Sequence, residues 1–201
     1  MSPRRYESTK RQAAAEETRR RMLAAARGLL AGASAPQISV DAVAKAADVS
    51  RQSVYNAFGS KSGLLEALFD SLAGRAGMGL DRAFTAPDAS AALSAFTETF
   101  CGFWASDRLV IRRLRGMAVL DPDLDRLLRE RDEMRRTALT ELLRRLTPTP
   151  DAEVVNVIWQ LTSFETYDAL TGHDTPRPLE EVMRVISGTA RVVHENADQS
   201  Q

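Results

Sequence analysis

Apolar residues recur along this chain at the three- and four-residue spacing of amphipathic helices. No convincing stretch alternates apolar and polar residues as a half-buried strand would. Prolines and glycines fall mostly between the periodic segments, where they favour turns. The sequence therefore predicts an all-α protein of about nine helices: 16–31, two short helices that begin near Ser39 and Ser50, a fourth that begins near Ser60, and then 89–105, 108–119, 124–146, 152–170 and 179–195.

The two short helices have the spacing of a helix-turn-helix unit. Ser39 and Ser50 can each cap a helix by accepting a hydrogen bond from a backbone N–H of its first turn. Asp48 lies in the turn between them. Two short helices joined by a three- or four-residue turn form this unit. We therefore expect a three-helix head, followed by a larger C-terminal helical bundle.

The helix that follows Ser50 has two unlike faces. At 100° per residue, Val54 and Phe58 point to the core, while Gln52 and Asn56 fall nearly opposite. Arg51 sits at the exposed N-terminal end. Guanidinium groups suit guanine edges and amides suit adenine edges. Arg51, Gln52 and Asn56 are therefore predicted to read bases in the major groove of double-stranded DNA.

Hydroxyl and ammonium groups flank this face. Ser53 and Tyr55 lie on its two sides and are predicted to hydrogen-bond phosphates. Lys61 starts the next helix, where the positive end of the helix dipole favours a phosphate. The alternative interpretation is an ordinary polar helix face with no ligand. The absence of Asp and Glu from residues 49–65 weighs against it, because a merely solvated surface usually mixes both signs.

Charge is unevenly distributed although the net charge is zero. Residues 1–61 hold eleven Lys and Arg against five Asp and Glu, a difference of +6, and the remaining residues hold sixteen against twenty-two, a difference of −6. A basic head favours a polyanionic partner, although a solvated N-terminal helix would have the same composition. The basic arm that would add sequence-independent affinity comprises Arg4, Arg5, Lys10, Arg11 and Arg19, Arg20 and Arg21.

The composition is that of a globular protein, with 44% hydrophobic and 27% charged residues. No apolar run approaches the roughly 20 residues that span a bilayer, and the N-terminal residues lack the apolar core of a secretory signal. The single cysteine, Cys101, suits a reducing compartment. We expect a cytoplasmic protein with no membrane partner.

The segment ISVDAVAKAADVSRQSVYNAFGSKSGLLEALFD resembles the DNA-binding domain of the TetR family of bacterial transcriptional regulators. The features that match in order and spacing are Val43-Ala44, Val49-Ser50, Val54-Tyr55, Phe58, Ser60-Lys61 and Leu64-Leu65. Two positions depart from the family pattern. Asp48 stands where glycine is usual, and aspartate tolerates a left-handed backbone better than most residues. Ser62-Gly63 stands where an acidic residue is frequent, which weakens the start of that helix.

The resemblance implies a division into a helix-turn-helix domain, residues 1–61, and an effector-binding and dimerisation domain, residues 62–201. Family members are usually homodimers that bind a small molecule. A two-fold dimer predicts an inverted-repeat, pseudo-palindromic operator. The resemblance implies a transcriptional regulator, and we expect a repressor that a small apolar effector releases from its operator through the fourth helix. It also implies that Arg51, Gln52 and Asn56 contact bases and that Ser53, Tyr55 and Lys61 contact phosphates.

The C-terminal region offers candidates for both remaining roles. An effector pocket should be apolar with few polar groups, and the residues proposed for it are Phe100, Phe103, Trp104, Met117, Met134, Trp159, Phe164 and Tyr167. The same residues could simply be core. The residues proposed for the dimer interface are Val154, Val157, Ile158, Leu161, Val182, Ile186 and Val193. Two adjacent amphipathic helices could instead bury these residues within one subunit.

Catalysis and cofactors have little support in the sequence. No nucleophile–base pair or phosphate loop is evident, and His173 and His194 lie too far apart to suggest a metal site. We expect no enzyme activity and no cofactor. Cys101 could be a redox sensor or a small buried hydrophobe. The alternative functions are an all-helical small-molecule-binding protein or enzyme that uses a C-terminal cavity, or an interaction adaptor with a degenerate head.

Overall fold

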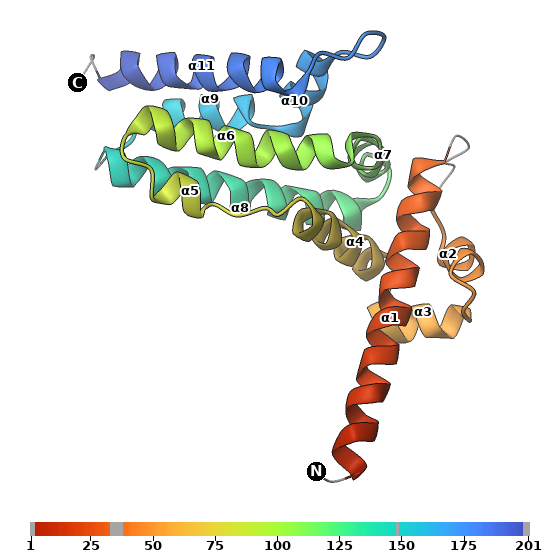
Figure 1. The fold of residues 1–201 in the computed structure, drawn as a ribbon. Coiled ribbons are helices and arrows are strands. Elements are labelled where there is room, and N and C mark those ends of the chain that lie inside the picture. The colour runs from red at the N-terminus through yellow and green to blue at the C-terminus, as the bar shows by residue number, and fades with distance from the viewer. Residues whose placement is uncertain (1–2, 33–37, 148, 199–201) are drawn as a thin grey trace. The chain divides into compact units, whose positions relative to one another are not determined.

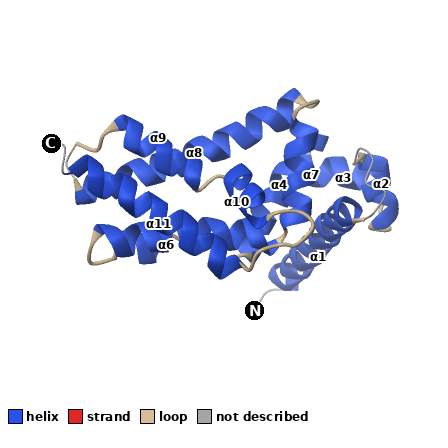
Figure 2. Ribbon diagram, turned by 90° about the horizontal axis from the view of Figure 1, so that it is seen from above, coloured by secondary structure: helices blue, strands red, loops and turns tan. Residues whose placement is uncertain are grey.

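The computed structural model describes residues 3–32, 38–147 and 149–198, and every regular element in these ranges is a helix (Figure 1). Figure 2 shows the same helices from above with the loops between them. The helices are α1 (Pro3–Ala31), α2 (Val40–Ala46), α3 (Arg51–Phe58), α4 (Lys61–Arg75), α5 (Asp81–Phe84), α6 (Ala89–Ser106), α7 (Arg108–Ala118), α8 (Pro122–Leu146), α9 (Ala152–Leu161), α10 (Phe164–Thr171) and α11 (Leu179–Asp198). The predicted all-α class is confirmed, and eleven described helices are consistent with about nine.

One predicted helix, 152–170, is two helices in the structure. Helix α9 ends at Leu161, and Ser163 caps α10 by accepting a hydrogen bond from the Thr166 N–H at 3.2 Å. The apolar spacing continues through the break, so periodicity alone could not reveal it. Because the Ser163 hydroxyl caps the first turn of α10, a second helix begins there instead of α9 continuing.

The chain divides into two compact units. The first comprises Met1–Ser71 with Leu109–Asp125, and the second comprises Leu72–Arg108 with Arg126–Gln201. The chain therefore passes from one unit to the other within α4, at the start of α7 and within α8. These units describe packing, and the functional boundary between residues 61 and 62 stays a prediction.

The first unit is built around buried aliphatic side chains from five helices. Helices α1, α2, α3, α4 and α7 all contribute, and the side chains of Ala26, Val43, Val54, Leu64 and Ile111 are at most 1% exposed. Burial of such groups contributes roughly 1.5–3 kcal/mol for each larger side chain. This core fixes α2 and α3 against α1.

The second unit is organised around α6. This helix packs along α11 and also contacts α5 and α10, while α9 packs on α11 (Figure 1). Helix α6 begins at Asp88, whose carboxylate accepts a hydrogen bond from the Ala91 N–H at 2.8 Å. Its buried face carries Phe96, Phe100 and Trp104. The aromatic candidates of the sequence therefore begin on a core helix.

Candidate nucleic-acid interface

Local capping sets the start and end of the recognition helix α3. The Ser50 hydroxyl accepts a hydrogen bond from the Ser53 N–H at 3.0 Å, and Ser39 does the same for α2 with Ala42 at 3.1 Å. Both predicted caps are confirmed. Asp48, in the turn, has a φ of 52°, which confirms the left-handed conformation expected there. The helix-turn-helix unit therefore forms from local chemistry.

The predicted base-reading face lies on the surface. Arg51, Gln52 and Asn56 are exposed, while Val54 on the opposite side is 1% exposed. The Gln52 amide donates to the Asn56 side-chain oxygen at 2.9 Å. The two amides of neighbouring turns therefore form one pair, whose outer donors and acceptors point away from the core.

Arg51 has an acidic neighbour from α2 that the sequence pattern does not predict. Its Nη1 lies 3.2 Å from Asp41 Oδ2, and its Nη2 donates to the Tyr55 hydroxyl at 3.3 Å. The hydrogen bond to Tyr55 and the charge of Asp41 raise the pKa of Arg51. Asp41 lies in the first turn of α2, where its negative charge also interacts favourably with the positive end of the helix dipole.

The predicted phosphate contacts occupy the edges of this face. Ser53 and Tyr55 are partly exposed, and the Ser53 and Ser50 hydroxyls lie 2.8 Å apart. Lys61 is partly exposed as well, but its Nζ lies 3.2 Å from Asp121 Oδ2 at the turn between α7 and α8. The structure thus brings all six predicted DNA contacts onto α3 and the first residue of α4.

The three neighbouring arginines of the basic arm do not share one environment. The Nη1 of Arg19 donates to the Ala57 carbonyl at 2.7 Å, and its guanidinium lies 4.4 Å from the centre of the Phe58 ring. Arg19 therefore caps the C-terminal end of α3. Arg20 pairs with Glu17 on the surface, and Arg21 is exposed.

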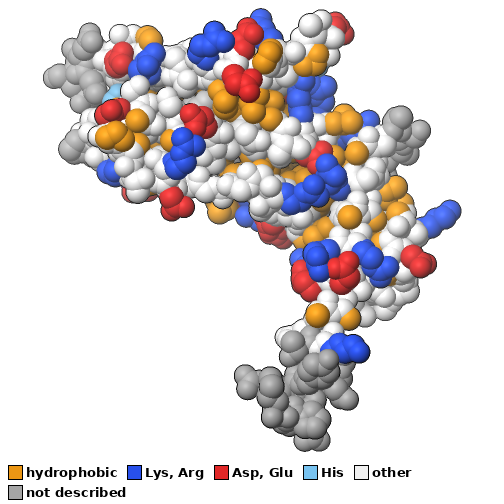
Figure 3. Space-filling view, viewed as in Figure 1, with side chains coloured by type: hydrophobic (Ala, Val, Ile, Leu, Met, Phe, Trp, Pro, Cys, Tyr) orange, Lys and Arg blue, Asp and Glu red, His pale blue; other side chains and the backbone are white. Residues whose placement is uncertain are grey.

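The remaining members of the arm are described only in part. Lys10 is exposed. The side chains of Arg4, Arg5 and Arg11 lie outside the described residues. On the face drawn in Figure 3, basic and acidic side chains are intermingled over the described surface. The case for a nucleic-acid interface therefore depends on the geometry of α3 more than on a single-sign patch.

Most of the predicted effector residues are packed inside the second unit. Trp104 lies 4.7 Å from Phe103 and 5.7 Å edge-on from Phe164, measured between ring centres, and its Nε1 donates to the Thr162 carbonyl at 3.1 Å. The candidates that are at most 4% exposed are Phe100, Phe103, Trp104, Phe164 and Tyr167. These side chains fill the core around α6 and α10.

The other three candidates are less deeply buried. Trp159 is partly exposed and donates its Nε1 to the Asp132 carbonyl at 3.0 Å. Met134 is 60% exposed on α8, and Met117 belongs to α7 of the first unit. An effector role for the eight residues stays a proposal.

A buried cation stands beside the aromatic cluster. Arg135 of α8 is 4% exposed, donates to Thr162 Oγ1 at 2.8 Å and to the Trp159 carbonyl, and lies 5.7 Å from the Phe100 ring centre. No role for Arg135 is predicted from the sequence. A usable signal existed, because Arg135 lies four residues before Leu139 on the apolar side of the helix.

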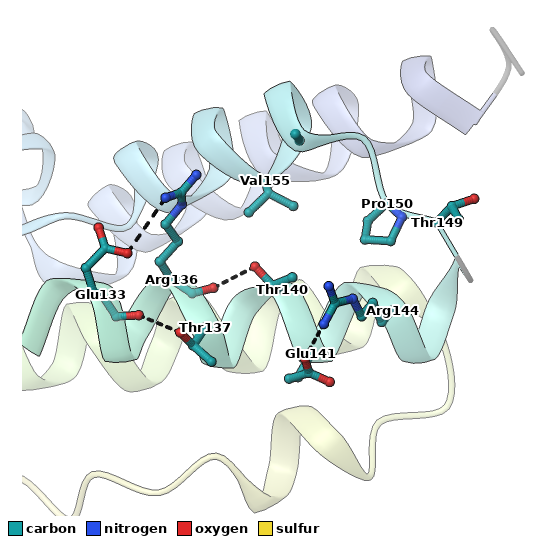
Figure 4. A pocket seen from close by; sticks show the side chains of 10 residues that line it. Glu133, Arg136, Thr137, Thr140, Glu141, Arg144, Thr149, Pro150 and Val155 are labelled. Carbon is teal, nitrogen blue, oxygen red and sulfur yellow. Dashed lines mark hydrogen bonds and ion pairs between the residues drawn. The ribbon is translucent and has the colours of Figure 1, made fainter.

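A polar groove of about 530 Å³ lies between α8 and the start of α9 (Figure 4). Arg136 pairs with Glu133 at 3.7 Å and Arg144 pairs with Glu141, so the charges along its wall are internally matched. None of the eight predicted effector residues lines it. The groove therefore has a different chemistry from the apolar pocket that the sequence predicts.

Three predicted interface residues are buried in the chain's own core. Ile158 of α9 and Val182 and Ile186 of α11 are at most 1% exposed. They pack where α9 and α11 meet within the unit. This is the alternative that the amphipathic pattern left open, and it holds for these three side chains.

The other side of the same two helices is open. Val157 on α9 is 45% exposed, and Val185 and Val192 on α11 are 41% and 51% exposed. The predicted interface residues that keep part of their surface are Val154, Val157, Leu161 and Val193. Any interface at this face would therefore use an apolar surface displaced from the buried stripe.

Burial also answers the question about Cys101. Its side chain is 0% exposed, and burial raises the pKa of the thiol from 9.0 to about 12. A protonated, inaccessible thiol is a poor nucleophile. Among the described residues, no cluster of three or more His, Cys, Asp and Glu could hold a metal ion, and no helix is long and apolar enough to cross a membrane.

A compact three-helix head with a capped turn and an exposed, amide-rich second helix defines a DNA-binding module of the helix-turn-helix class. Residues 22–68 match the family model described as bacterial regulatory proteins, tetR family. This match includes most of the segment that resembles the TetR family, and it covers the helix-turn-helix unit of the head.

Several regulators are similar to this chain. The chain is 38% identical over 112 residues to the HTH-type transcriptional regulator AlkX of Mycobacterium tuberculosis. The match covers 53% of this chain and 51% of that relative, so this chain matches about half of the relative's length. The TetR-like regulator LfrR of Mycobacterium smegmatis, in complex with proflavine, is 25% identical with a TM-score of 0.56 over 89% of this chain and 96% of its own. A transcriptional regulator of Rhodococcus sp. Rha1, 22% identical, has the same fold, with a TM-score of 0.64 over 86% of this chain and 95% of its own.

Proposed function

We propose that this chain is a ligand-responsive regulator of transcription that binds an inverted-repeat DNA operator as a homodimer. The observation that carries the proposal is the face of α3, where Arg51, Gln52 and Asn56 are exposed around a buried Val54. These side chains are the commonest readers of guanine and adenine edges in the major groove. The match of residues 22–68 to the tetR-family model supports the same proposal.

The contacts between these side chains support a preorganised reading face. The Gln52–Asn56 hydrogen bond and the Arg51–Asp41 ion pair hold the three predicted base-contacting side chains in defined positions in the free protein. Each bidentate pair with the correct base is worth about 1–3 kcal/mol of discrimination. Ser53, Tyr55 and Lys61 would then fix the register through phosphates.

The homodimer in this proposal forms through the open side of α9 and α11. Val157, Val185 and Val192 give this surface exposed apolar side chains on two helices that already pack together. Two heads related by a two-fold axis read two half-sites in opposite directions. The operator would therefore be a pseudo-palindrome.

Repression that ends when an effector binds is the regulatory mode we propose. LfrR, a relative of the same fold, binds the aromatic molecule proflavine. In this chain the buried aromatic side chains around α6 and α10, such as Trp104 and Phe164, offer a surface that an apolar effector would contact after local opening. Linkage requires that effector and DNA then weaken each other's binding by the same factor.

Selection of bound duplexes from a random DNA pool tests the proposal. Wild-type protein at near-physiological salt should enrich an inverted repeat, and Tyr55→Ala should lose that enrichment while its folded structure persists. Salt-sensitive binding to every duplex, without enrichment, would refute a sequence-reading function. That outcome would favour the second candidate, a small-molecule-binding protein that uses its C-terminal unit.

A further inference from the structure

Lys61, a proposed phosphate contact, is already held by a carboxylate. Its Nζ lies 3.2 Å from Asp121 Oδ2, and the two side chains are 37% and 26% exposed. The other oxygen of Asp121 accepts a hydrogen bond from the Leu124 N–H at 3.2 Å and so caps α8. One carboxylate therefore serves a helix end and the ammonium group together.

Asp121 stays ionised at neutral pH. Partial burial raises the pKa of its carboxyl, but the hydrogen bond from Leu124 and the contact with Lys61 outweigh that effect, so its pKa lies below the ordinary value. Lys61 therefore faces a full negative charge in the free protein. An ion pair that is half-buried is screened by salt less than an exposed one.

Packing brings this carboxylate to the head. Helix α7 belongs to the same compact unit as α1 to α3, and Val110, Ile111 and Leu114 are fully buried there. The Arg113 guanidinium donates to the carbonyls of Leu30 and Gly32 at the end of α1. The turn that follows α7 is therefore fixed close to the first residue of α4.

The negative charge beside Lys61 comes from a distant segment of the chain. Residues 49–65 contain no Asp or Glu, as a surface that meets phosphates should. The carboxylate that reaches Lys61 comes from a position 60 residues further along the chain. A phosphate that approached the Lys61 ammonium would meet this second anion and would have to displace it or share the donor with it.

We propose that Asp121 competes with DNA phosphate for Lys61 and so lowers the affinity of the head for DNA. This inference rests on the proposed function, because it assumes that Lys61 binds a phosphate. The competition also offers a route for regulation. Asp121 caps α8, and α8 continues past Asp125 into the second unit, so a shift in the first turn of that helix would move the competing carboxylate.

Asp121→Asn is the decisive variant, because asparagine caps helices as well as aspartate does and carries no charge. We would measure its Kd, and that of the wild type, for a selected duplex and an unrelated duplex across a salt series. The variant should bind both duplexes more tightly. Its slope of log affinity against log salt should be steeper by about one phosphate contact, so the gain over wild type grows roughly threefold for each fourfold drop in salt.

Matched variants separate competition from other causes. Asp123→Asn makes the same charge change in the first turn of α8 and should leave the slope unchanged. Lys61→Ala should abolish the gain when combined with Asp121→Asn. Asp121→Ser also keeps a capping oxygen and should show the same increase in DNA affinity. Agreement between the two variants would exclude a folding defect in one of them as the cause.

The outcomes are distinct. If wild type binds the selected duplex and Lys61→Ala weakens it, but Asp121→Asn changes neither affinity nor slope, the competition is refuted and the proposed function stands. Weaker binding by Asp121→Asn would also refute it and would make Asp121 a positioning residue for Lys61. If wild type shows no selective binding, the proposed function itself fails.

Discussion

At the scale of single residues, chemically identical side chains have different roles because of where they point. Arg19 and Arg20 are neighbours in the sequence. Arg19 turns inward to the Ala57 carbonyl and the Phe58 ring, whereas Arg20 pairs on the surface with Glu17. A charged hydrogen bond and a cation–π contact position α3, and a surface ion pair contributes little.

Arg19→Gln should therefore destabilise the head and Arg20→Gln should not. We expect the free energy of unfolding to fall by about 1–3 kcal/mol for Arg19→Gln, because it loses the charged hydrogen bond and the ring contact. For Arg20→Gln the expected change is within about 0.5 kcal/mol. Urea unfolding curves measure both. Equal destabilisation by the two variants would contradict the assigned role of Arg19 as a cap.

Cys101 predicts a specific dependence of stability on pH. The thiol pKa is about 12 in the folded protein and 9.0 ordinarily, so the unfolded chain loses its proton first as the pH rises. The stability contributed by this group is complete below pH 9 and is lost between pH 9 and 12, by up to about 1.4 kcal/mol per pH unit.

The measurement compares urea unfolding of wild type and Cys101→Ala from pH 8 to pH 10. Wild type should lose more stability than the variant over this range, because only wild type has the thiol. The native thiol should also resist alkylation until urea is added. Rapid alkylation of the folded protein would refute the buried, protonated state and reopen a redox role.

At the scale of secondary structure, glycine placement explains how α4 starts. The N–H of Gly63 donates to the Ser60 hydroxyl at 2.9 Å, and a Cβ on Gly63 would lie 2.2 Å from the Phe58 carbonyl oxygen. Gly63 therefore permits the first turn of α4 to pack against the end of α3. The departure from the family pattern at Ser62-Gly63 has a steric reason that the sequence alone did not reveal.

Gly63→Ala and Gly74→Ala should change stability in opposite directions, although both lie in α4. Gly63→Ala forces backbone to move and should cost about 1–3 kcal/mol. A Cβ on Gly74 meets nothing within 4 Å, so alanine there should stabilise the helix by roughly 0.5–1 kcal/mol. Thermal unfolding followed by circular dichroism measures both changes. A tolerated Gly63→Ala would show that α3 and α4 can separate freely.

At the scale of the whole molecule, assembly would depend on the apolar surface left on α9 and α11. Val157, Val185 and Val192 are exposed there, while Ile158 and Ile186 between the helices are buried. Obligate interfaces bury apolar side chains of this kind. The exposed valines, rather than the buried isoleucines, are the positions where a charge would disrupt a dimer without disrupting the fold.

Val157→Glu should convert a dimer to a monomer and reduce affinity for an inverted repeat, because one head alone contacts one half-site. Val119→Glu is the control: Val119 is 82% exposed in the first unit and should leave the mass unchanged. Sedimentation equilibrium measures the mass of each variant. A wild-type monomer at micromolar concentration, or a dimeric Val157→Glu, would contradict an interface at this face.

Local interactions made much of this protein predictable from its sequence. Helix periodicity, the Ser39 and Ser50 caps and the left-handed turn at Asp48 depend on residues within about four positions of each other. The exposed face of α3 follows from the same periodicity. These features predicted the fold class, the helix-turn-helix unit and the resemblance to the TetR family before any tertiary contact was considered.

Tertiary packing decided the contacts between distant segments. The pairing of Lys61 with Asp121, the inward turn of Arg19, and the burial of Arg135 beside Phe100 each join residues at least 35 positions apart. Tertiary packing also determines which valines on α9 and α11 stay exposed. A sequence pattern specifies which face of a helix is apolar, but only the packing of neighbouring helices determines how much of that face is covered.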